Sequence, residues 1–372
     1  MKTLKKVLAV VMVLTLVVTC FAACGNKKTT YLIGCTGPLT GDNKSYGESV
    51  RNGAQLAIEE INANGGLNGV EFTFEMLDDK ATEADAATGY DTLYDKGMQI
   101  ALGSVTSGSC EAFAKRANED KLFFITPSAS AANVIADRPY AFRVCFGDPD
   151  QGVLAAEKLT ADFEKIGCIY NNGDDYSKGV YAAFEGKMKE LNKAFEVRTF
   201  DNDTATDFSS QVEALKDCDV IFLPIYYTEA GLIARACVDK GYNDIFLFGC
   251  DGLDGIAAQI DETVTNRISY ITPFDPNSTS AKSAAFVSAY ETKYGSTPDQ
   301  FAADGYDAVY IIFEAMSKAG VNDVNISAED LSALVAAAIT AEDFTYEGVT
   351  GTMTWDETGA CTKVPVIVEL NK

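Results

Sequence analysis

Segments with the pattern of a strand alternate with segments with the pattern of a helix along most of this chain. Residues 31–37 (YLIGCTG) form an apolar run of strand length. The stretch 48–66 then places apolar residues at helical spacing and ends in Asn-Gly-Gly, a helix stop signal. The next segment, 70–77 (VEFTFEML), alternates as a strand does. This order predicts parallel sheets that are covered by helices on both faces.

The alternation falls into two blocks, near 31–147 and 148–272, and each is long enough for a domain of ordinary size. We therefore expect an α/β protein with two doubly wound parallel-sheet lobes. Beyond residue 275 the pattern predicts three helices followed by a β-hairpin, at 279–293, 302–318, 327–339 and 348–370, the last with its turn at 356–359.

The first residues have the pattern of an export signal. A basic start, MKTLKK, precedes an apolar run over 7–18, which is too short to span a bilayer. The run ends in Phe-Ala-Ala-Cys, which resembles a bacterial lipobox. This predicts a lipoprotein signal peptide at 1–23, cleavage before Cys24, a lipid on its sulfur, and a linker over 24–30. The alternative is a simple secreted protein in which Cys24 has no special role.

Composition excludes several classes of function. The net charge of −24 at pH 7 repels nucleic acids and anionic lipids, so we expect no nucleic-acid partner. The chain contains no histidine, which excludes histidine-based catalytic triads, general bases and metal ligands. The missing histidine therefore argues against an enzyme and against a histidine metal site.

The cysteines of the body are widely spaced and show no CxxC or zinc pattern. Several stand where a strand would carry Val or Ala, so we interpret them as small buried hydrophobic residues. Their even number leaves disulfides open. They are Cys35, Cys110, Cys145, Cys168, Cys218, Cys237, Cys250 and Cys361.

The stretch 102–110 (LGSVTSGSC) joins an apolar run to a helical pattern. It lacks the G-x-S-x-G order of a nucleophile elbow and the G-x-x-x-x-G-K-[ST] order of a phosphate-binding loop. Hydroxyl and N–H groups at the start of a helix suit a carboxylate. Thr106, Ser107 and Ser109 provide such groups, and the alternative is that Ser107 or Ser109 only caps the helix.

Other strand ends carry complementary groups. Ser128 and Ser130 follow the next strand, and Asp251 follows a strand of the second block. Hydroxyl groups from one lobe and an acid from the other suit a zwitterion, because both of its charges must be paired when water is excluded. Four tyrosines also fall in such loops: Tyr46, Tyr176, Tyr226 and Tyr227.

With these motifs in order, the chain resembles the leucine/isoleucine/valine-binding protein family, the solute-binding proteins of ABC importers. The resemblance covers about 31–370 and rests on IGCTGPLTGDNKSYGESVRNGAQLAIEEINANGGLNG, LGSVTSGS, FFITPSAS, FRVCFGDPDQG, YNNGDDYSKG, FLPIYYTEAG, LFGCDG and FAADGYDAVY. It implies a type I periplasmic binding protein fold, in which two lobes joined by a three-strand hinge close on a ligand. It also implies lobes made of 31–147 plus 275–345 and of 148–274 plus 346–372.

The resemblance assigns roles to residues. Ser107, Ser130 and the backbone at Ser128 would hold the α-carboxylate of an amino acid. Asp251 and Tyr176 would meet its ammonium group. Selectivity for the side chain would come from Tyr46, Tyr226 and Phe301, with Tyr227 as the alternative to Tyr226.

Each of these assignments has a structural alternative. Tyr46 and Phe301 could be ordinary rim or core aromatics, Asp251 could cap a helix, and Tyr176 could serve packing only. Asp304 replaces a residue that is usually apolar in the family, and it would face either the cleft or, as we favour, solvent.

The sequence therefore predicts an extracytoplasmic, lipid-anchored, monomeric protein that captures an amino acid, branched-chain or otherwise hydrophobic, for the permease subunits of an ABC importer. We expect no cofactor, no metal and no catalysis. The alternative function is a sensor of amides, urea or amino acids that uses the same clamp without transport.

Overall fold

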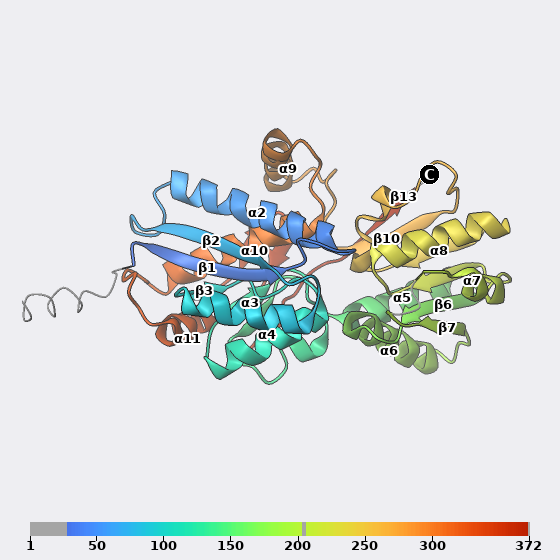
Figure 1. The fold of residues 1–372 in the computed structure, drawn as a ribbon, viewed down its shortest axis with the longest axis horizontal. Helices are drawn as coiled ribbons and strands as arrows, with labels where there is room; N and C mark the ends of the chain where they lie inside the picture. The colour runs from blue at the N-terminus through green and yellow to red at the C-terminus, as the bar shows by residue number, and fades with distance from the viewer. Residues whose placement is uncertain (1–27, 203–205, 371–372) are drawn as a thin grey trace, which may run out of the picture.

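The computed structural model describes residues 28–202 and 206–370. The predicted signal peptide and the lipidation site at Cys24 lie outside the described residues. Two lobes lie side by side along the long axis of the molecule (Figure 1). Each lobe is built on its own parallel sheet, as the alternating pattern predicted.

The first lobe contains a five-stranded sheet in the order β2-β1-β3-β4-β5, with all pairs parallel. Its strands are β1 (Thr30–Gly37), β2 (Glu71–Asp78), β3 (Ile100–Ala101), β4 (Phe124–Thr126) and β5 (Ala141–Arg143). The helices between them are α2 (Lys44–Ala63), α3 (Glu83–Asp95), α4 (Ser107–Glu119) and the short 3₁₀ helix η1 (Ala132–Val134). The order of the strands reverses between β1 and β3, and such a switch point is where open α/β sheets bind ligands.

The second lobe repeats this order. Its sheet runs β13-β10-β9-β8-β6-β7, and all pairs are parallel except β13 with β10. The strands are β6 (Ile166–Asn171), β7 (Glu196–Phe200), β8 (Val220–Leu223), β9 (Phe246–Gly249), β10 (Ile268–Thr272) and β13 (Val366–Leu370). The helices are α5 (Asp148–Asp162), α6 (Asp175–Glu190), α7 (Ser209–Ala214) and α8 (Tyr227–Lys240), with 3₁₀ turns η2 (Asp251–Leu253) and η3 (Ile256–Ala258). The second switch point lies between β6 and β8.

After β10 the chain returns to the first lobe and adds further helices and a two-stranded ribbon. These are α9 (Ala281–Tyr294), α10 (Gln300–Lys318), α11 (Ala328–Ile339), β11 (Tyr346–Gly348) and β12 (Gly351–Met353). Helix α10 packs on α2 with unusually close backbones. A Cβ atom on Gly53 would lie 1.9 Å from the carbonyl oxygen of Ala302, and one on Gly305 would lie 2.7 Å from that of Val50. Glycine at these positions therefore lets the two helices meet.

The chain crosses between the sheets three times: from β5 to α5, from β10 to α9, and from β12 to β13 (Figure 1). These three connections are the hinge that the family resemblance implied. The loops that follow β1, β3 and β4 in the first lobe therefore face those that follow β6, β8 and β9 in the second.

The tail differs in part from the predicted hairpin. Its turn forms at 356–359, where the N–H of Gly359 donates to the carbonyl of Asp356, and Trp355 bridges Cys361 in antiparallel fashion. The return strand then leaves the hairpin and pairs with β10 as β13, because the sheet of the second lobe offers it a full antiparallel register.

The prediction placed all of 346–372 with the second lobe. The indole of Trp355 instead donates a 2.8 Å hydrogen bond to the carbonyl of Arg143, and the N–H of Arg143 donates to the carbonyl of Gly359. These bonds join the turn to β5 of the first lobe. The other boundaries of the division between lobes stay a prediction.

Candidate functional site

A small pocket lies between the two switch points and has about 250 Å³ of space between its atoms, including the part that opens to solvent. The segments that follow six strands (β1, β3, β4, β6, β8 and β9) and the start of α10 supply its walls. All eight residues predicted to bind a ligand line it, which confirms that the fold brings them together. The lining consists of Tyr46, Val105, Thr106, Ser107, Ser128, Ser130, Tyr176, Tyr226, Asp251, Gly252 and Phe301.

The first-lobe wall is the N-terminus of α4. Thr106 is the N-cap residue, but its side chain makes no capping hydrogen bond, and Ser107 and Ser109 stand inside the first turn. The alternative that either serine caps this helix is therefore wrong. The hydroxyl oxygen of Ser107 accepts a 3.2 Å hydrogen bond from the N–H of Ala131, which fixes its position in the wall. Val105, Thr106 and Ser107 line the pocket, so the start of α4, which carries the positive end of the helix dipole, lies at its wall.

The loop after β4 completes this wall. The hydroxyl of Ser128 donates a 2.6 Å hydrogen bond to the carbonyl of Val105, so the hydroxyl is already occupied. Ser130 is 1% exposed and lies beside the buried carboxyl group of Asp148. The guanidinium of Arg143 donates to the carbonyls of Ser130 and Ala131 and thereby holds the turn in place.

Asp251 forms the second-lobe wall. Its backbone is held on both sides, because its N–H donates to the side-chain oxygen of Gln151 at 3.1 Å and its carbonyl accepts from the amide of Gln300 at 2.6 Å. The carboxyl oxygen Oδ1 is buried and has no hydrogen-bond partner among the described residues. Burial raises the pKa of Asp251 to about 7, while the neighbouring polar groups of Tyr176 and Gln151 oppose that rise. Asp251 starts a short 3₁₀ helix without capping it, so the capping alternative is wrong here too.

Aromatic rings form the remaining walls. The ring of Tyr46 lies 4.2 Å from that of Phe301 and 5.7 Å from that of Tyr226, centroid to centroid. Tyr226 in turn stacks on Tyr176 at 5.1 Å with an angle of 10°. Tyr226 lines the pocket, whereas Tyr227 uses its hydroxyl to reach the carbonyl of Asp42 in the other lobe at 2.5 Å. Of the two alternatives, the structure therefore places Tyr226 at the pocket.

The lobes are closed on the pocket. The hydroxyl of Tyr46, from α2, donates to the carbonyl of Gly252 and accepts from the N–H of Tyr227, both in the second lobe. The hydroxyl of Thr228 also reaches the carbonyl of Asp42. These bonds require both lobes in contact and would be lost on opening.

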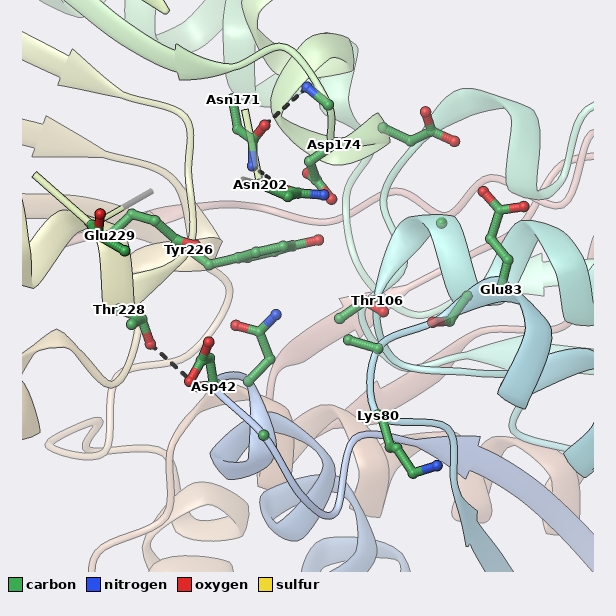
Figure 2. Close-up of a pocket in the computed structure, with 18 residues that line it drawn as sticks. Asp42, Lys80, Glu83, Thr106, Asn171, Asp174, Asn202, Tyr226, Thr228 and Glu229 are labelled. Carbon is green, nitrogen blue, oxygen red and sulfur yellow. Dashed lines mark hydrogen bonds between the residues drawn. The ribbon is translucent and has the colours of Figure 1, made fainter. Parts of the chain in front are cut away.

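A larger polar space, which we call the outer chamber, lies outside the pocket (Figure 2). It shares Thr106 and Tyr226 with the pocket, and both lobes contribute to it. None of its acidic residues is among the ligand-binding residues predicted from the sequence. The run NNGDD at the end of β6 could have indicated two of them, because it follows one of the strands at the second switch point. The acids of the chamber are Asp42, Glu83, Asp174, Asp175 and Glu229.

Asp304 lies neither in the pocket lining nor in solvent. Its carboxylate forms an ion pair with the ammonium group of Lys363, and their side chains are 2% and 1% exposed. Lys363 also donates a 2.9 Å hydrogen bond to the carbonyl of Val144 in the hinge. The expectation of a solvated helix charge was wrong, because the third hinge connection covers this face of α10.

Other expectations concern the remainder of the described chain. The eight body cysteines are free, and all except the half-buried Cys361 are buried, as expected for small hydrophobic residues. Within residues 28–202 and 206–370, no cluster of acidic and cysteine side chains could hold a metal ion. In the same ranges, no helix combines the length and apolarity that crossing a membrane requires.

Comparison with known proteins agrees with this architecture. The Leu/Ile/Val-binding protein BraC3 of Rhizobium johnstonii is 29% identical over 338 residues, which cover 89% of this chain and 88% of the relative. A leucine-, isoleucine-, valine-, threonine- and alanine-binding protein of Pseudomonas aeruginosa is 28% identical over 350 residues, covering 91% of this chain and 89% of the relative.

Solved structures are similar over the whole fold. The leucine-binding protein LivK of Thermotoga maritima superposes with a TM-score of 0.81 at 26% identity, covering 91% of this chain and 95% of its own. The branched-chain amino acid binding protein LivJ of Streptococcus pneumoniae, solved with isoleucine, gives 0.78 at 28% identity, covering 91% of this chain and 100% of its own. A solute-binding protein of Rhodopseudomonas palustris, solved with 3,4-dihydroxybenzoic acid, shares the fold with a TM-score of 0.80 at 19% identity, covering 91% and 93%.

The family model described as periplasmic binding protein matches residues 30–370, nearly the whole of the described structure. The chain has two parallel-sheet lobes, three connections between them and one pocket that lies between the two switch points. It belongs to the periplasmic binding protein family.

Proposed function

We propose that this protein captures a free α-amino acid between its lobes and delivers it to an ABC importer. The observation that carries the proposal is the carboxyl group of Asp251, which is buried, lacks a partner at Oδ1 and faces a helix N-terminus across a small pocket. A zwitterion matches this arrangement, because it presents one charge to each wall.

The α-carboxylate would bind at the start of α4. Backbone N–H groups of the first helical turn lack intrahelical partners and carry the positive end of the helix dipole. Ser107 and Ser130 would add hydroxyl donors, and the chain at Ser128 would add backbone contacts. Because the hydroxyl of Ser128 is engaged with Val105, its side chain would contribute little.

The α-ammonium would bind at Asp251. An ammonium beside Oδ1 pairs with the ionised carboxylate and so offsets the cost of burying that negative charge. The hydroxyl oxygen of Tyr176 accepts a 3.1 Å hydrogen bond from the N–H of Gly252, the residue after Asp251. Tyr176 would therefore meet the ammonium group from the same wall as Asp251.

The ligand side chain would contact Tyr46, Tyr226 and Phe301. Their rings offer apolar faces to an aliphatic stem, and the stem would bury against them. Branched-chain and other hydrophobic amino acids are therefore the first candidates, and the names of the Rhizobium and Pseudomonas relatives agree with that choice.

The proposal includes the place of action. Export by the leader and a lipid on Cys24 would hold the monomeric protein outside the cell membrane, where it would meet the permease subunits. It would act without cofactor, metal or turnover, as a solute-binding protein does.

A thermal-shift screen of the purified protein with the free amino acids and their amides tests the proposal. A ligand that binds the native state raises the apparent melting temperature by mass action. We expect free amino acids to raise it and their amides, which lack the carboxylate, to do so less. Ser107→Ala should weaken binding of the best ligand in calorimetry. If no amino acid raises the melting temperature, the proposal fails.

A further inference from the structure

The outer chamber continues the cleft beyond the pocket. In Figure 2 the carboxylate of Asp174 and the hydroxyl of Tyr226 point toward the middle of the chamber, and Thr106 stands on the facing wall. Because Thr106 and Tyr226 belong to both spaces, a ligand that extends out of the pocket passes between them. The chamber has about 1360 Å³ of space between its atoms, including the part that opens to solvent.

Asp174 is an acid of the chamber wall that forms no ion pair in the described structure. It caps α6 and accepts a 2.9 Å hydrogen bond from the N–H of Ser177. Burial and, to a smaller extent, the charge of Asp175 raise its pKa to about 6, against the opposing effects of Ser177, Lys178 and Tyr226. Lys178 is itself paired with Asp175 at 2.8 Å.

Glu229 adds a second acid from the first turn of α8. Its oxygen Oε2 is buried and has no hydrogen-bond partner within residues 28–202 and 206–370. Burial, together with the smaller effect of the charges of Asp174 and Asp42, raises the pKa of Glu229 to about 7. The one lysine in the chamber wall, Lys80, is engaged with Asp85 at 3.3 Å.

The facing wall supplies an independent observation. Thr106 and Ser109, at the start of α4, are 6% and 1% exposed, and both side chains line the chamber. Neither hydroxyl has a hydrogen-bond partner in the described structure. Unpaired buried hydroxyl groups are costly, so they indicate a polar group that occupies the chamber when the site is filled.

We propose that the outer chamber is a subsite for a positively charged side-chain end, so that the protein prefers α-amino acids with basic side chains over the hydrophobic ones that the aromatic walls of the pocket alone would favour. This inference rests on the proposed function, since it takes the α-amino and α-carboxyl groups to bind in the pocket. The aliphatic stem of such a ligand contacts the aromatic walls, as long cationic side chains do elsewhere. Its charged end then lies near Asp174 and Glu229, with the free hydroxyl groups of α4 around it.

The test compares three ligands of nearly equal length. Lysine carries a cation at the end of its side chain, norleucine carries a methyl group, and 2-aminoadipate carries a carboxylate. We expect lysine to bind at least about tenfold more tightly than norleucine, and 2-aminoadipate to bind worst, because charge-assisted pairing in a partly buried site outweighs a methyl contact.

Variants assign the effect to the chamber. Asp174→Asn and Glu229→Gln should each reduce the preference for lysine over norleucine severalfold while leaving the affinity for norleucine nearly unchanged. Asp175→Asn is the matched control, since Asp175 is the neighbouring acid of the chamber wall and is already paired with Lys178. It should change the preference little.

The outcomes separate the two proposals. If none of the three ligands and no other amino acid binds, the proposed function fails. If norleucine or leucine binds as tightly as lysine, and Asp174→Asn leaves their ratio unchanged, the subsite is overturned while the amino-acid function stands.

Discussion

The hydroxyl of Tyr46 in the first lobe donates a 2.5 Å hydrogen bond to the carbonyl of Gly252 in the second, one residue beyond Asp251. The same hydroxyl accepts a 3.2 Å bond from the N–H of Tyr227. One oxygen thus joins α2 to two loops of the other lobe. Closure of the lobes and placement of Asp251 are therefore coupled through Tyr46.

Tyr46→Phe should weaken ligand binding without unfolding the protein. The ring and its contact with Phe301 remain, but the two bonds that favour the closed state are lost. A net loss of about 1 kcal/mol for such bonds corresponds to roughly five- to tenfold lower affinity, which titration calorimetry would measure. Tyr31→Phe is a matched control, because the hydroxyl of Tyr31 is buried in the same lobe without a partner. An unchanged affinity in Tyr46→Phe would contradict the coupling.

Asp251→Ala should abolish most amino-acid binding. Removing one partner of a desolvated charge pair costs several kcal/mol, so we expect a loss of roughly a hundredfold or more in affinity. Asp244→Ala provides the control, since Asp244 is exposed and precedes the opposite end of β9. Equal affinity of Asp251→Ala and the unchanged protein would sink the assignment of the ammonium group.

The fold was predictable because its signals are local. Strand and helix periods alternate in the sequence itself, and polar strand ends predicted the edge of each sheet at which the pocket lies. The expected helix over 302–318 corresponds to α10, Gln300–Lys318. The eight site residues came from motifs in the order of a known family, and the fold brings all of them to one pocket. Their roles in binding stay a prediction.

Features that depend on distant chain segments were not predictable in the same way. The partner of Asp304 is 59 residues away, and nothing near either residue indicates that a hinge connection buries both. The tail was expected to form a simple hairpin, but β10 offered its last strand a better partner. The outer chamber draws on loops of both lobes, so its charge becomes visible only when the lobes are placed together.

Affinity for an amino acid should fall as the pH drops below about 7. In the unliganded protein burial raises the pKa of Asp251 to about 7, and only the ionised form pairs with an ammonium group. The bound state therefore has the lower pKa, and binding below that value must release a proton. Between pH 6.5 and 5 the dissociation constant should increase by up to about tenfold for each unit that the pH falls. From pH 7.5 to 8 it should be nearly constant.

Other carboxyl groups at the lobe interface also titrate. Burial and the neighbouring charge of Asp254 raise the pKa of Asp299 to about 7, and burial raises that of Asp254. Asp251→Asn isolates the effect of Asp251. The other carboxyl groups titrate in both proteins, so the difference between the two pH profiles of affinity reports Asp251 alone. A pH profile of equal slope in both proteins would show that Asp251 is not the group responsible.

Lys363→Met should destabilise the protein strongly at neutral pH. The substitution leaves the carboxyl of Asp304 buried without its partner, and breaking a buried pair on one side costs about 3–5 kcal/mol. Burial already raises the pKa of Asp304 to about 6 against the opposing charge of Lys363. Without Lys363 that pKa rises further, so the folded variant binds a proton more readily than the unfolded chain. Its stability deficit should therefore shrink as the pH falls from 7.5 to 5.5.

The matched double variant, Asp304→Leu with Lys363→Met, removes both charges and fills the space with apolar atoms. Its free energy of unfolding in urea should return to within about 1–2 kcal/mol of the unchanged protein, because replacing a whole buried pair is often neutral. Amino-acid affinity should stay the same in the double variant, since neither residue lines the pocket. A double variant as unstable as Lys363→Met would show that the lysine stabilises the hinge through its bond to the carbonyl of Val144 rather than through Asp304.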